Sequence, residues 1–566
     1  GKKSLADMDK LIGKGYSPIV ADDIISEPYA KGTKFTSRPD DPYNKVTIES
    51  LSGDLQLFDG RMNHNNGWFV LRSNIKPGVT KGAVKWIITP NVVADWMYQP
   101  VIQTSQIGYH PTQDKEAVIE MDIRDSRKET AQIIRIDADG EKVVKNVTPA
   151  NWGKFLRYNY LKVNFTDVKE PGLYKIKYNT SVSPIFRIDN DVYARGVWQP
   201  VLEYFLPVQM CHMRVNEKYR VWHDCCHMDD AQMAPAHNHI DGYDQKEGLS
   251  KFKPGEVVPG VNIGGWHDAG DFDLRIESQA GESYILALAY EAFHPNLDVT
   301  SIDQINRVTE IHQPDGKNDL LQQVENGALT VVNGYLALGR LYRGIICNDL
   351  RQYVLLGDAA AMTDGKIGNE DDRWIFTEDN PGRELSTAAQ LAAVSRVLKG
   401  FNDTLSVHCL DIARKVYAST GSGNNRALFP KVQAAVELYL TTGEQPYMDF
   451  ILDNQELIIK QIGRIGWYTA RVEKLFAQMK NKKAKAFSAA FRKALTGYEQ
   501  ELNKQVQETP YGVPYRPNIW GAGWDIQRFG FQHYFLTTAY PEIFPKAPVF
   551  NALNFILGCH PGSNQA

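Results

Sequence analysis

The segment from Gly264 to Asp273 concentrates the residues best suited to chemistry. It reads GGWHDAGDFD, so glycines and small residues bracket three carboxylates within six positions. Asp268 and Asp271 are three residues apart, and on a helical turn such neighbours point the same way. Two carboxylates that close repel each other unless a proton, a metal or a polarised water lies between them. The segment is therefore a candidate catalytic pair, and an Asp-rich turn or a calcium loop is the structural alternative.

A second set of reactive side chains lies around this segment. Cys211, Cys226 and His227 precede it, and His267 stands directly before Asp268. Two thiolates and two imidazoles make up a closed tetrahedral set that is typical of structural zinc. The spacing is not that of a short zinc finger, so buried free cysteines and surface histidines are the alternative. Six cysteines in 566 residues are too few for a disulfide scaffold.

The elements that position these side chains change in kind along the chain. Residues 1–100 combine an arm of little periodicity with a β-rich accessory region, where short β-type runs alternate with turn signals between residues 45 and 88. Residues 101–190 hold seven short β-type runs at about 8–12 residue spacing, which is typical of an immunoglobulin-like β-sandwich. Residues 191–566 change to a helical period and predict an all-α barrel built from helical hairpins.

Eleven helices are expected in the barrel region, and many are apolar on more than one side, as buried helices are. A closed barrel of six hairpins needs twelve, so one helix is miscalled or absent. The expected helices cover residues 192–213, 277–293, 302–312, 319–343, 386–400, 402–419, 427–442, 445–460, 484–505, 524–538 and 547–557.

Composition excludes several classes of function. The net charge of −4 leaves no basic surplus to neutralise phosphates, which argues against nucleic-acid binding. No run of 18 apolar residues occurs, so no membrane span is expected, and the N-terminus lacks the apolar core of a signal peptide. Aromatic residues make up 11% of the chain. Their flat rings can stack on sugars, although large cores would explain the same composition.

Taken with its context, GGWHDAGDFD resembles the GGW-(Y/H)-DAGD signature of glycoside hydrolase family 9. The stretch QTSQIGY from Gln103 resembles the opening of that family's immunoglobulin-like module, and LNFILGCHP from Leu553 resembles its LNYILGRNP run. The resemblance covers the chain from about Val101 onward. It implies an (α/α)6 barrel behind the sandwich and inverting hydrolysis of β-1,4-linked glucan-type polysaccharides or oligosaccharides.

The resemblance also implies roles for particular residues. Asp271 matches the general base, and Asp268 matches the second carboxylate, which helps to hold the attacking water. Trp266 and Trp520 are expected to bind substrate. Trp520 lies in NIWGAGW, which resembles a family segment near the cleft, where a tryptophan can stack on a sugar ring and where core packing is the alternative.

The chain departs from the family pattern in two places. The family continues DAGD with Y-G-(K/R)-Y, whereas this chain has Phe272-Asp273-Leu274-Arg275. The family's proton donor is a glutamate downstream of the LNYILGRNP run, and none follows that run here. We therefore expect the general acid in a segment beyond Ala566. Recruitment of another glutamate, such as Glu508, is the alternative.

Family members with histidine before the first aspartate tend to carry zinc, so the resemblance implies a structural zinc ion on Cys211, Cys226, His227 and His267. Calcium is a second candidate metal. An exo-acting β-glucosidase or β-glucosaminidase of the same family is one alternative function, and a non-catalytic carbohydrate-binding protein is another. A polysaccharide lyase on an (α/α) barrel is a third, which the paired aspartates disfavour. We expect an exported protein whose signal peptide is not in this chain.

Overall fold

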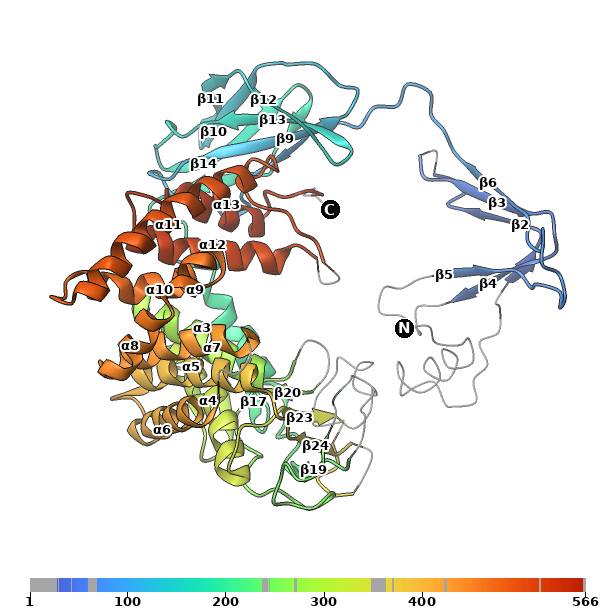
Figure 1. Cartoon of the computed structure of the whole chain (residues 1–566). Coiled ribbons are helices and arrows are strands. Elements are labelled where there is room, and N and C mark those ends of the chain that lie inside the picture. The colour runs from blue at the N-terminus through green and yellow to red at the C-terminus, as the bar shows by residue number, and fades with distance from the viewer. Residues whose placement is uncertain are drawn as a thin grey trace.

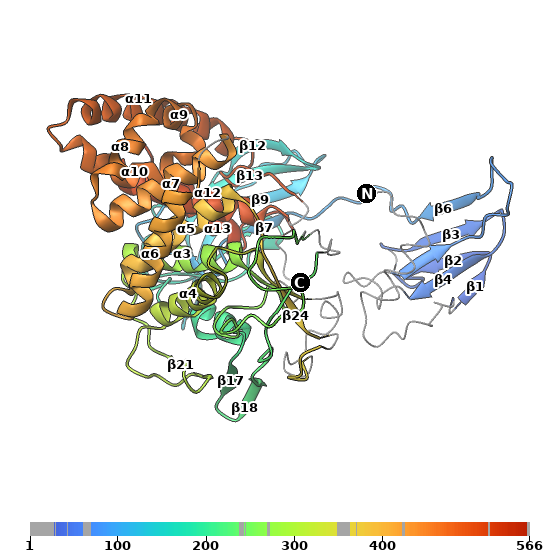
Figure 2. The same ribbon diagram turned by 60° about the horizontal axis from the view of Figure 1, so that its bottom comes forward.

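The computed structural model describes residues 28, 30–41, 43–59, 69–236, 243, 245–268, 272–347, 363–368, 371–421, 425–518 and 521–562. Strands dominate before residue 190 and helices dominate after residue 275. Figures 1 and 2 show the first six strands set apart from the rest of the chain, with an extended segment leading to the next β unit. The order of β-rich region, sandwich and helical region is the one that the sequence predicts.

The β-rich accessory region forms two small sheets of three strands, in the orders β1-β4-β5 and β2-β3-β6. The short β-type runs predicted between residues 45 and 88 correspond to β3, β4, β5 and β6. The bounds are β1 (Ala30–Gly32), β2 (Lys34–Ser37), β3 (Val46–Ser50), β4 (Leu55–Asp59), β5 (Phe69–Arg72) and β6 (Trp86–Pro90).

The next unit is a two-sheet sandwich. One sheet has the order β11-β10-β14-β16-β8 with β15 beside β14, and the other has the order β12-β13-β9-β7. Ile119, Ile133, Leu161 and Ile176 fill the space between the sheets and are fully buried. The bounds are β7 (Val101–Gln103), β8 (Gly108–Tyr109), β9 (Glu116–Asp122), β10 (Ala131–Asp137), β11 (Gly140–Val147), β12 (Ala150–Phe155), β13 (Tyr158–Asn164), β14 (Gly172–Tyr178), β15 (Ser181–Val182) and β16 (Phe186–Ile188).

The helical region is the (α/α)6 barrel, and its inner helices are apolar almost all round. Helix α5 packs on both α6 and α7, and α3 packs on α4. The bounds are η1 (Val201–Phe205, a π-helix), α2 (Leu206–Gln209), α3 (Ile276–Phe293), α4 (Asp319–Leu338), α5 (Pro381–Leu398), α6 (Asp403–Ser419), α7 (Asn425–Thr442), α8 (Gln445–Asp453), α9 (Gln455–Lys460), α10 (Ile462–Ala477), α11 (Lys482–Val506), α12 (Gly523–Ala539) and α13 (Ala547–Ile556).

Short strands between the helices form two further sheets, in the orders β18-β17-β22-β21 and β19-β24-β23-β20. They lie in the long loops at one end of the barrel (Figure 1). The bounds are β17 (Arg214–Glu217), β18 (Arg220–His223), β19 (Gln232–Met233), β20 (Leu274–Arg275), β21 (Thr300–Asp303), β22 (Val308–Ile311), β23 (Gly344–Cys347) and β24 (Arg373–Phe376).

The helix predicted at 302–312 is wrong, because β21 and β22 form a hairpin there. The carboxylate of Asp303 accepts hydrogen bonds from the backbone N–H groups of Ile305 and Asn306, both at 2.9 Å. Arg307 follows with φ of 57°. An aspartate that bonds the backbone two and three residues ahead favours a turn over a helix.

Helix α10, with the sequence IGRIGWYTARVEKLFA, lies where no helix is expected from the sequence. Gly463 and Gly466 lower the local helix propensity, although the apolar residues of this segment keep a helical spacing. Packing overrides that preference, because Trp467, Val472 and Phe476 are buried in the barrel core. At 192–213, by contrast, only η1 and α2 are helical. Among the described residues, no helix is long and apolar enough to cross a membrane.

The sandwich is attached to the last helices of the barrel. Val118 and Tyr160 of the sandwich pack with Phe555 and Cys559 near the end of α13. The Tyr511 hydroxyl donates a hydrogen bond to Oε1 of Gln103 at 2.9 Å. The two units therefore share an apolar interface that contains a buried hydrogen bond.

Candidate active site and metal centre

The segment that carries Asp268 runs beside the end of α2, where the backbones are hydrogen-bonded. The N–H of Cys211 donates to the carbonyl of Gly265 at 2.9 Å, and the N–H of His267 donates to the carbonyl of Gln209 at 2.8 Å. The predicted catalytic segment is thus joined to the end of the first barrel helix. This pairing brings Cys211 and His267 close together although they are far apart in the sequence.

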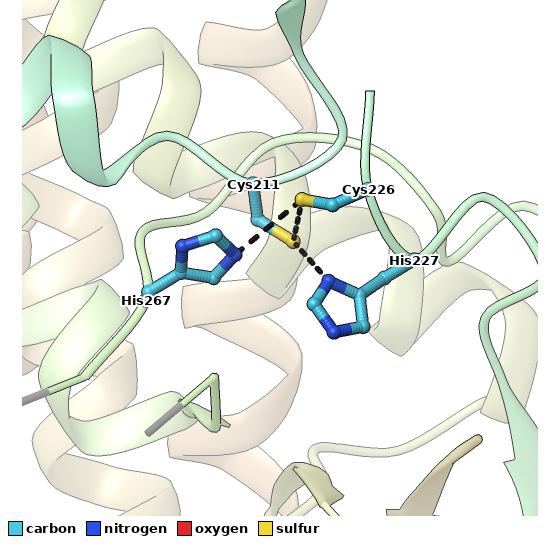
Figure 3. Close-up of side chains that lie close together, drawn as sticks. All are labelled: Cys211, Cys226, His227 and His267. Atoms are coloured by element: carbon cyan, nitrogen blue, oxygen red, sulfur yellow. Dashed lines mark hydrogen bonds between the residues drawn. The ribbon is translucent and has the colours of Figure 1, made fainter. Parts of the chain in front are cut away.

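All four predicted metal ligands lie together. Figure 3 shows the side chains of Cys211, Cys226, His227 and His267 pointing toward one another. Their ligand atoms all lie within 4.8 Å of each other. The two sulfur atoms are 3.7 Å apart, Nδ1 of His227 is 3.7 Å from the sulfur of Cys211, and Nε2 of His267 is 3.5 Å from the sulfur of Cys226. Except for His267, which is partly exposed, these residues are buried.

This arrangement fits a tetrahedral metal ion. Zinc binds sulfur at about 2.3 Å and nitrogen at about 2.0 Å, so the edges of a Cys₂His₂ tetrahedron measure roughly 3.3–3.8 Å. The three measured separations fall in that range. Burial, followed by the nearby charge of Arg373, lowers the pKa of His227 to about 4. Its ring is therefore neutral near pH 7, which is the form that binds metal.

A buried network that no sequence pattern indicates lies behind the four predicted metal ligands. The guanidinium of Arg373 donates to the sulfur of Cys211 at 3.1 Å and to Oδ1 of Asp230 at 3.1 Å. His212 lies 2.8 Å from Oδ2 of Asp230 and 3.0 Å from the carbonyl of Gly264. The network thus connects β24 to both the metal ligands and the glycines before Asp268. Arg373 is 162 residues from Cys211, and no spacing pattern signals that contact.

Of the predicted catalytic pair, Asp268 is described and Asp271 lies outside the described residues. Asp268 is partly exposed, and its Oδ2 lies 3.2 Å from Nε of Arg275. Asp273, the third carboxylate of the segment, is 1% exposed and accepts a hydrogen bond from the backbone N–H of Cys347 at 2.8 Å. The first and third carboxylates therefore have different surroundings, and only Asp268 reaches solvent.

Of the two predicted substrate-binding tryptophans, the structure describes only Trp266. Trp520 lies outside the described residues. Trp266 is 1% exposed, and its indole N–H donates to Oε1 of Gln323 at 2.8 Å. A Cβ on Gly327 would come within 2.4 Å of the Trp266 ring, so the ring is packed against backbone. With no face open to a sugar, Trp266 is a core residue that supports the loop, which corrects the expectation of substrate contact.

An exposed tryptophan does line a groove. The groove has a volume of about 870 Å³, and its lining is mostly apolar. Trp524 of α12 is 69% exposed, and Trp467 of α10 and Tyr284 of α3 lie beside it in the groove. Stacking on sugar rings needs aromatic faces of this kind. Trp524 belongs to the same NIWGAGW segment as the predicted Trp520.

Two glutamates bear on the question of a proton donor. Glu508 is ion-paired with Arg516, and the hydrogen bond from that guanidinium lowers the pKa of Glu508. An acid that must stay protonated near neutral pH needs the opposite shift. Glu282 on α3 has that upward shift: the protein packed around its carboxyl group, and then the charge of Asp268, raise its pKa to about 7, although the residue as a whole is exposed on the helix surface. No sequence motif marks Glu282. It lies seven residues after Arg275, which is about two helical turns along α3.

A group of carboxylates lies near the metal ligands. Carboxylate oxygens of Asp229, Asp371 and Asp372 are all within 4.8 Å of one another. Oxygen ligands of this kind suit calcium, the second metal that the sequence analysis names.

Comparison with known proteins decides the family. The family model described as "Glycosyl hydrolase family 9" matches residues 201–563, and one described as "Cellulase N-terminal ig-like domain" matches residues 97–183. The chain belongs to glycosyl hydrolase family 9. The sequence resemblance is thereby confirmed, and the described barrel is a family 9 barrel.

Relatives within family 9 cover most of the chain. A xyloglucan-specific endo-β-1,4-glucanase of Bacteroides ovatus is 24% identical over 455 residues, which are 74% of this chain and 72% of the relative. Endoglucanase D of Acetivibrio thermocellus is 19% identical over 378 residues, 63% of this chain and 54% of that protein.

Solved structures of family 9 share the fold. A metagenome-derived endoglucanase aligns with a TM-score of 0.62 and 20% identity, over 82% of this chain and 84% of that one. A Zn-binding triple mutant of the family 9 endoglucanase J30 aligns with a TM-score of 0.57 and 19% identity, over 78% of this chain and 80% of that one.

Proposed function

We propose that this family 9 chain is an inverting hydrolase of β-1,4-linked glucan-type polysaccharides or oligosaccharides, acting as an endoglucanase. The observation that carries the proposal is the partly exposed carboxylate of Asp268 within the family signature, three residues before Asp271. The β-glucanase names of the relatives support the choice of substrate. The exposed Trp524 in an open groove supports a polymer over a small sugar.

In this proposal Asp271 removes a proton from the attacking water and Asp268 holds the same water. Two carboxylates that bind one water fix the direction of both its lone pair and its proton. This orientation lowers the entropic part of the activation barrier to hydrolysis. An inverting site keeps its acid and base about 6.5–9.5 Å apart so that water fits between base and sugar. Trp524 would stack on a sugar unit in the groove, and Trp520 keeps its predicted role in substrate binding.

We also propose that zinc is the metal held by Cys211, Cys226, His227 and His267. The donor set and the separations of its atoms support this choice. A closed four-ligand site leaves no position for substrate, so the ion would support the loop and take no part in the chemistry. Calcium at the Asp229 group is a second metal proposal.

We also propose that the chain divides into three units, residues 1–100, 101–190 and 191–566. A further proposal is that the protein is exported. Export is supported by the polymeric substrate, which is too large to enter a cell.

The deciding experiment measures the release of reducing ends from linear β-1,4-glucan, mixed-linkage glucan, xyloglucan and chitosan fragments. An endoglucanase lowers the viscosity of a soluble β-glucan early in the reaction, whereas an exo-acting enzyme does not. NMR of the first product reports the configuration, and an α-anomer would support inversion. Binding of glucans without any release would favour the carbohydrate-binding alternative.

A further inference from the structure

We propose that Arg275, held in place by Asp273, is a positioning residue that fixes the partly exposed carboxylate of Asp268. This inference rests on the proposed function, in which Asp268 holds the attacking water. It concerns the part of the segment where the chain departs from the family pattern. The sequence FDLR at 272–275 contains both Asp273 and Arg275.

The geometry places one guanidinium between two carboxylates. Nε of Arg275 lies 3.2 Å from Oδ2 of Asp268, and its Nη2 lies 3.5 Å from Oδ2 of Asp273. The exposed fractions of the three side chains are 30% for Arg275, 23% for Asp268 and 2% for Asp273. Arg275 therefore links the buried carboxylate of Asp273 to the partly exposed carboxylate of Asp268. A planar guanidinium fixes direction as well as distance, which a flexible cation does not.

The anchor itself is held by a strand. Oδ1 of Asp273 accepts the backbone N–H of Cys347 at 2.8 Å, which leaves Oδ2 to face Arg275. The backbone of Arg275 pairs with Gly344 in the ladder between β20 and β23. A Cβ on Gly344 would come within 2.8 Å of the carbonyl of Leu274, so this close approach requires glycine. Strand pairing thus fixes the backbone position from which the Arg275 side chain extends.

Aromatic packing restricts the guanidinium further. The guanidinium carbon of Arg275 lies 5.7 Å from the centre of the Tyr243 ring, which is 5% exposed. Arg343 lies over the same ring at 4.7 Å. A cation over an aromatic ring is attracted to it and keeps its N–H groups free for acceptors at its edge. Arg275 is therefore restrained by a strand, a carboxylate and a ring before it reaches Asp268.

These contacts also assign Asp273 a role. Its burial keeps it from the attacking water, so it is not a substitute for Asp271 as the base. Its negative charge instead balances the guanidinium, since a buried cation without a partner is costly. Arg275 thus lies between two anions, and of these only Asp268 reaches solvent.

The test compares Arg275→Gln and Arg275→Lys with a matched control, Arg383→Gln. Arg383 is similarly exposed, at 26%, and forms ion pairs with Glu277 and Glu378. The measurements are kcat and KM on a soluble β-glucan, with the denaturation midpoint of each variant. We expect Arg275→Gln to lower kcat at least about tenfold with KM within threefold. Arg275→Lys should recover part of the loss, and Arg383→Gln should stay within twofold of the parent.

The outcomes separate this inference from the proposed function. A normal kcat for Arg275→Gln, or an equal loss in Arg383→Gln, would overturn it. If Arg275→Gln does not fold, Asp273→Asn takes its place, because asparagine keeps an acceptor for Cys347 but removes the charge that faces Arg275. A normal kcat in that variant overturns the inference as well. If Asp268→Asn keeps full activity, the proposed function fails, whereas an inactive Asp268→Asn beside a fully active Arg275→Gln refutes this inference alone.

Discussion

The side chains of His267 and Asp268, neighbours in the sequence, contact different partners. Nε2 of His267 lies 3.5 Å from the sulfur of Cys226, and Oδ2 of Asp268 lies 3.2 Å from Nε of Arg275. In extended backbone, successive side chains point to opposite sides. One peptide unit therefore joins the candidate metal centre to the carboxylate that contacts Arg275.

The first prediction concerns the metal. We expect purified protein to contain about one zinc ion per chain and Cys211→Ser to lose it, with a loss of thermal stability larger than the loss of turnover of the chains that remain folded. A closed zinc site contributes its binding energy to folding. Cys409→Ser is the control, since Cys409 is equally buried but lies in α6. Full zinc content in Cys211→Ser would contradict the assignment.

The second prediction concerns the base. Asp271→Asn removes the proton acceptor but keeps the size of the side chain, so turnover should fall by about 10²–10⁴-fold with little change in substrate binding. Asp268→Asn should also be harmful, because the water loses one of its two anchors. Azide can replace the water in a site without a base, and it should restore part of the activity of Asp271→Asn as a glycosyl azide of inverted configuration. Near-normal turnover of Asp271→Asn would show that another group is the base.

A third prediction follows from Glu282. Its pKa is raised to about 7, so it gains a negative charge near Asp268 as the pH rises through neutrality. We expect turnover to decline above about pH 7 and the decline to disappear in Glu282→Gln. The measurement is kcat against pH from 5 to 9. Glu508→Gln is the control, because the pKa of Glu508 is shifted downward. An unchanged profile in Glu282→Gln would exclude Glu282 from the titration.

The fourth prediction concerns stability. Asp319 at the start of α4 is 1% exposed, and burial raises its pKa to about 7 despite hydrogen bonds from the N–H groups of Val299 and Thr300. Between about pH 4 and 7 the folded chain keeps a proton that the unfolded chain has released. The stability from this group is therefore present below about pH 4 and is lost as the pH rises to 7.

Asp319→Asn should remove that pH dependence, with a difference of at least about 1 kcal/mol between pH 5 and pH 7.5, since one pKa unit corresponds to about 1.4 kcal/mol. Denaturant unfolding at the two pH values measures it. Asp403→Asn is a matched control, because Asp403 also follows an asparagine N-cap at the start of a helix and is exposed. Equal pH dependence in the parent and Asp319→Asn would refute the prediction.

Local periodicity predicted the sandwich strands and most helices. The family resemblance, more than any spacing, brought together Cys211, Cys226, His227 and His267, whose ligand atoms lie within 4.8 Å of one another. Local patterns failed where packing or a turn decides the structure. Gly463 and Gly466 hid α10, and the turn after Asp303 became a hairpin. Trp266 was expected at the substrate because tryptophan suits sugars, but its burial depends on Gly327 of α4, which is distant in the sequence. The contact between Arg373 and Cys211 has no local signal at all.

A metal ion at the candidate centre would crosslink two distant parts of the chain. A metal bound by Cys211 and His267 closes a long loop of the unfolded chain, as a disulfide between those positions would. The chain-entropy relation for disulfides gives about 4 kcal/mol for a loop of that length. Unlike a disulfide, this crosslink depends on the concentration of free metal and not on an oxidant. Metal supply would then set how long the loop that carries Asp268 keeps its folded form, and a chelator would open this crosslink where a disulfide reductant would not.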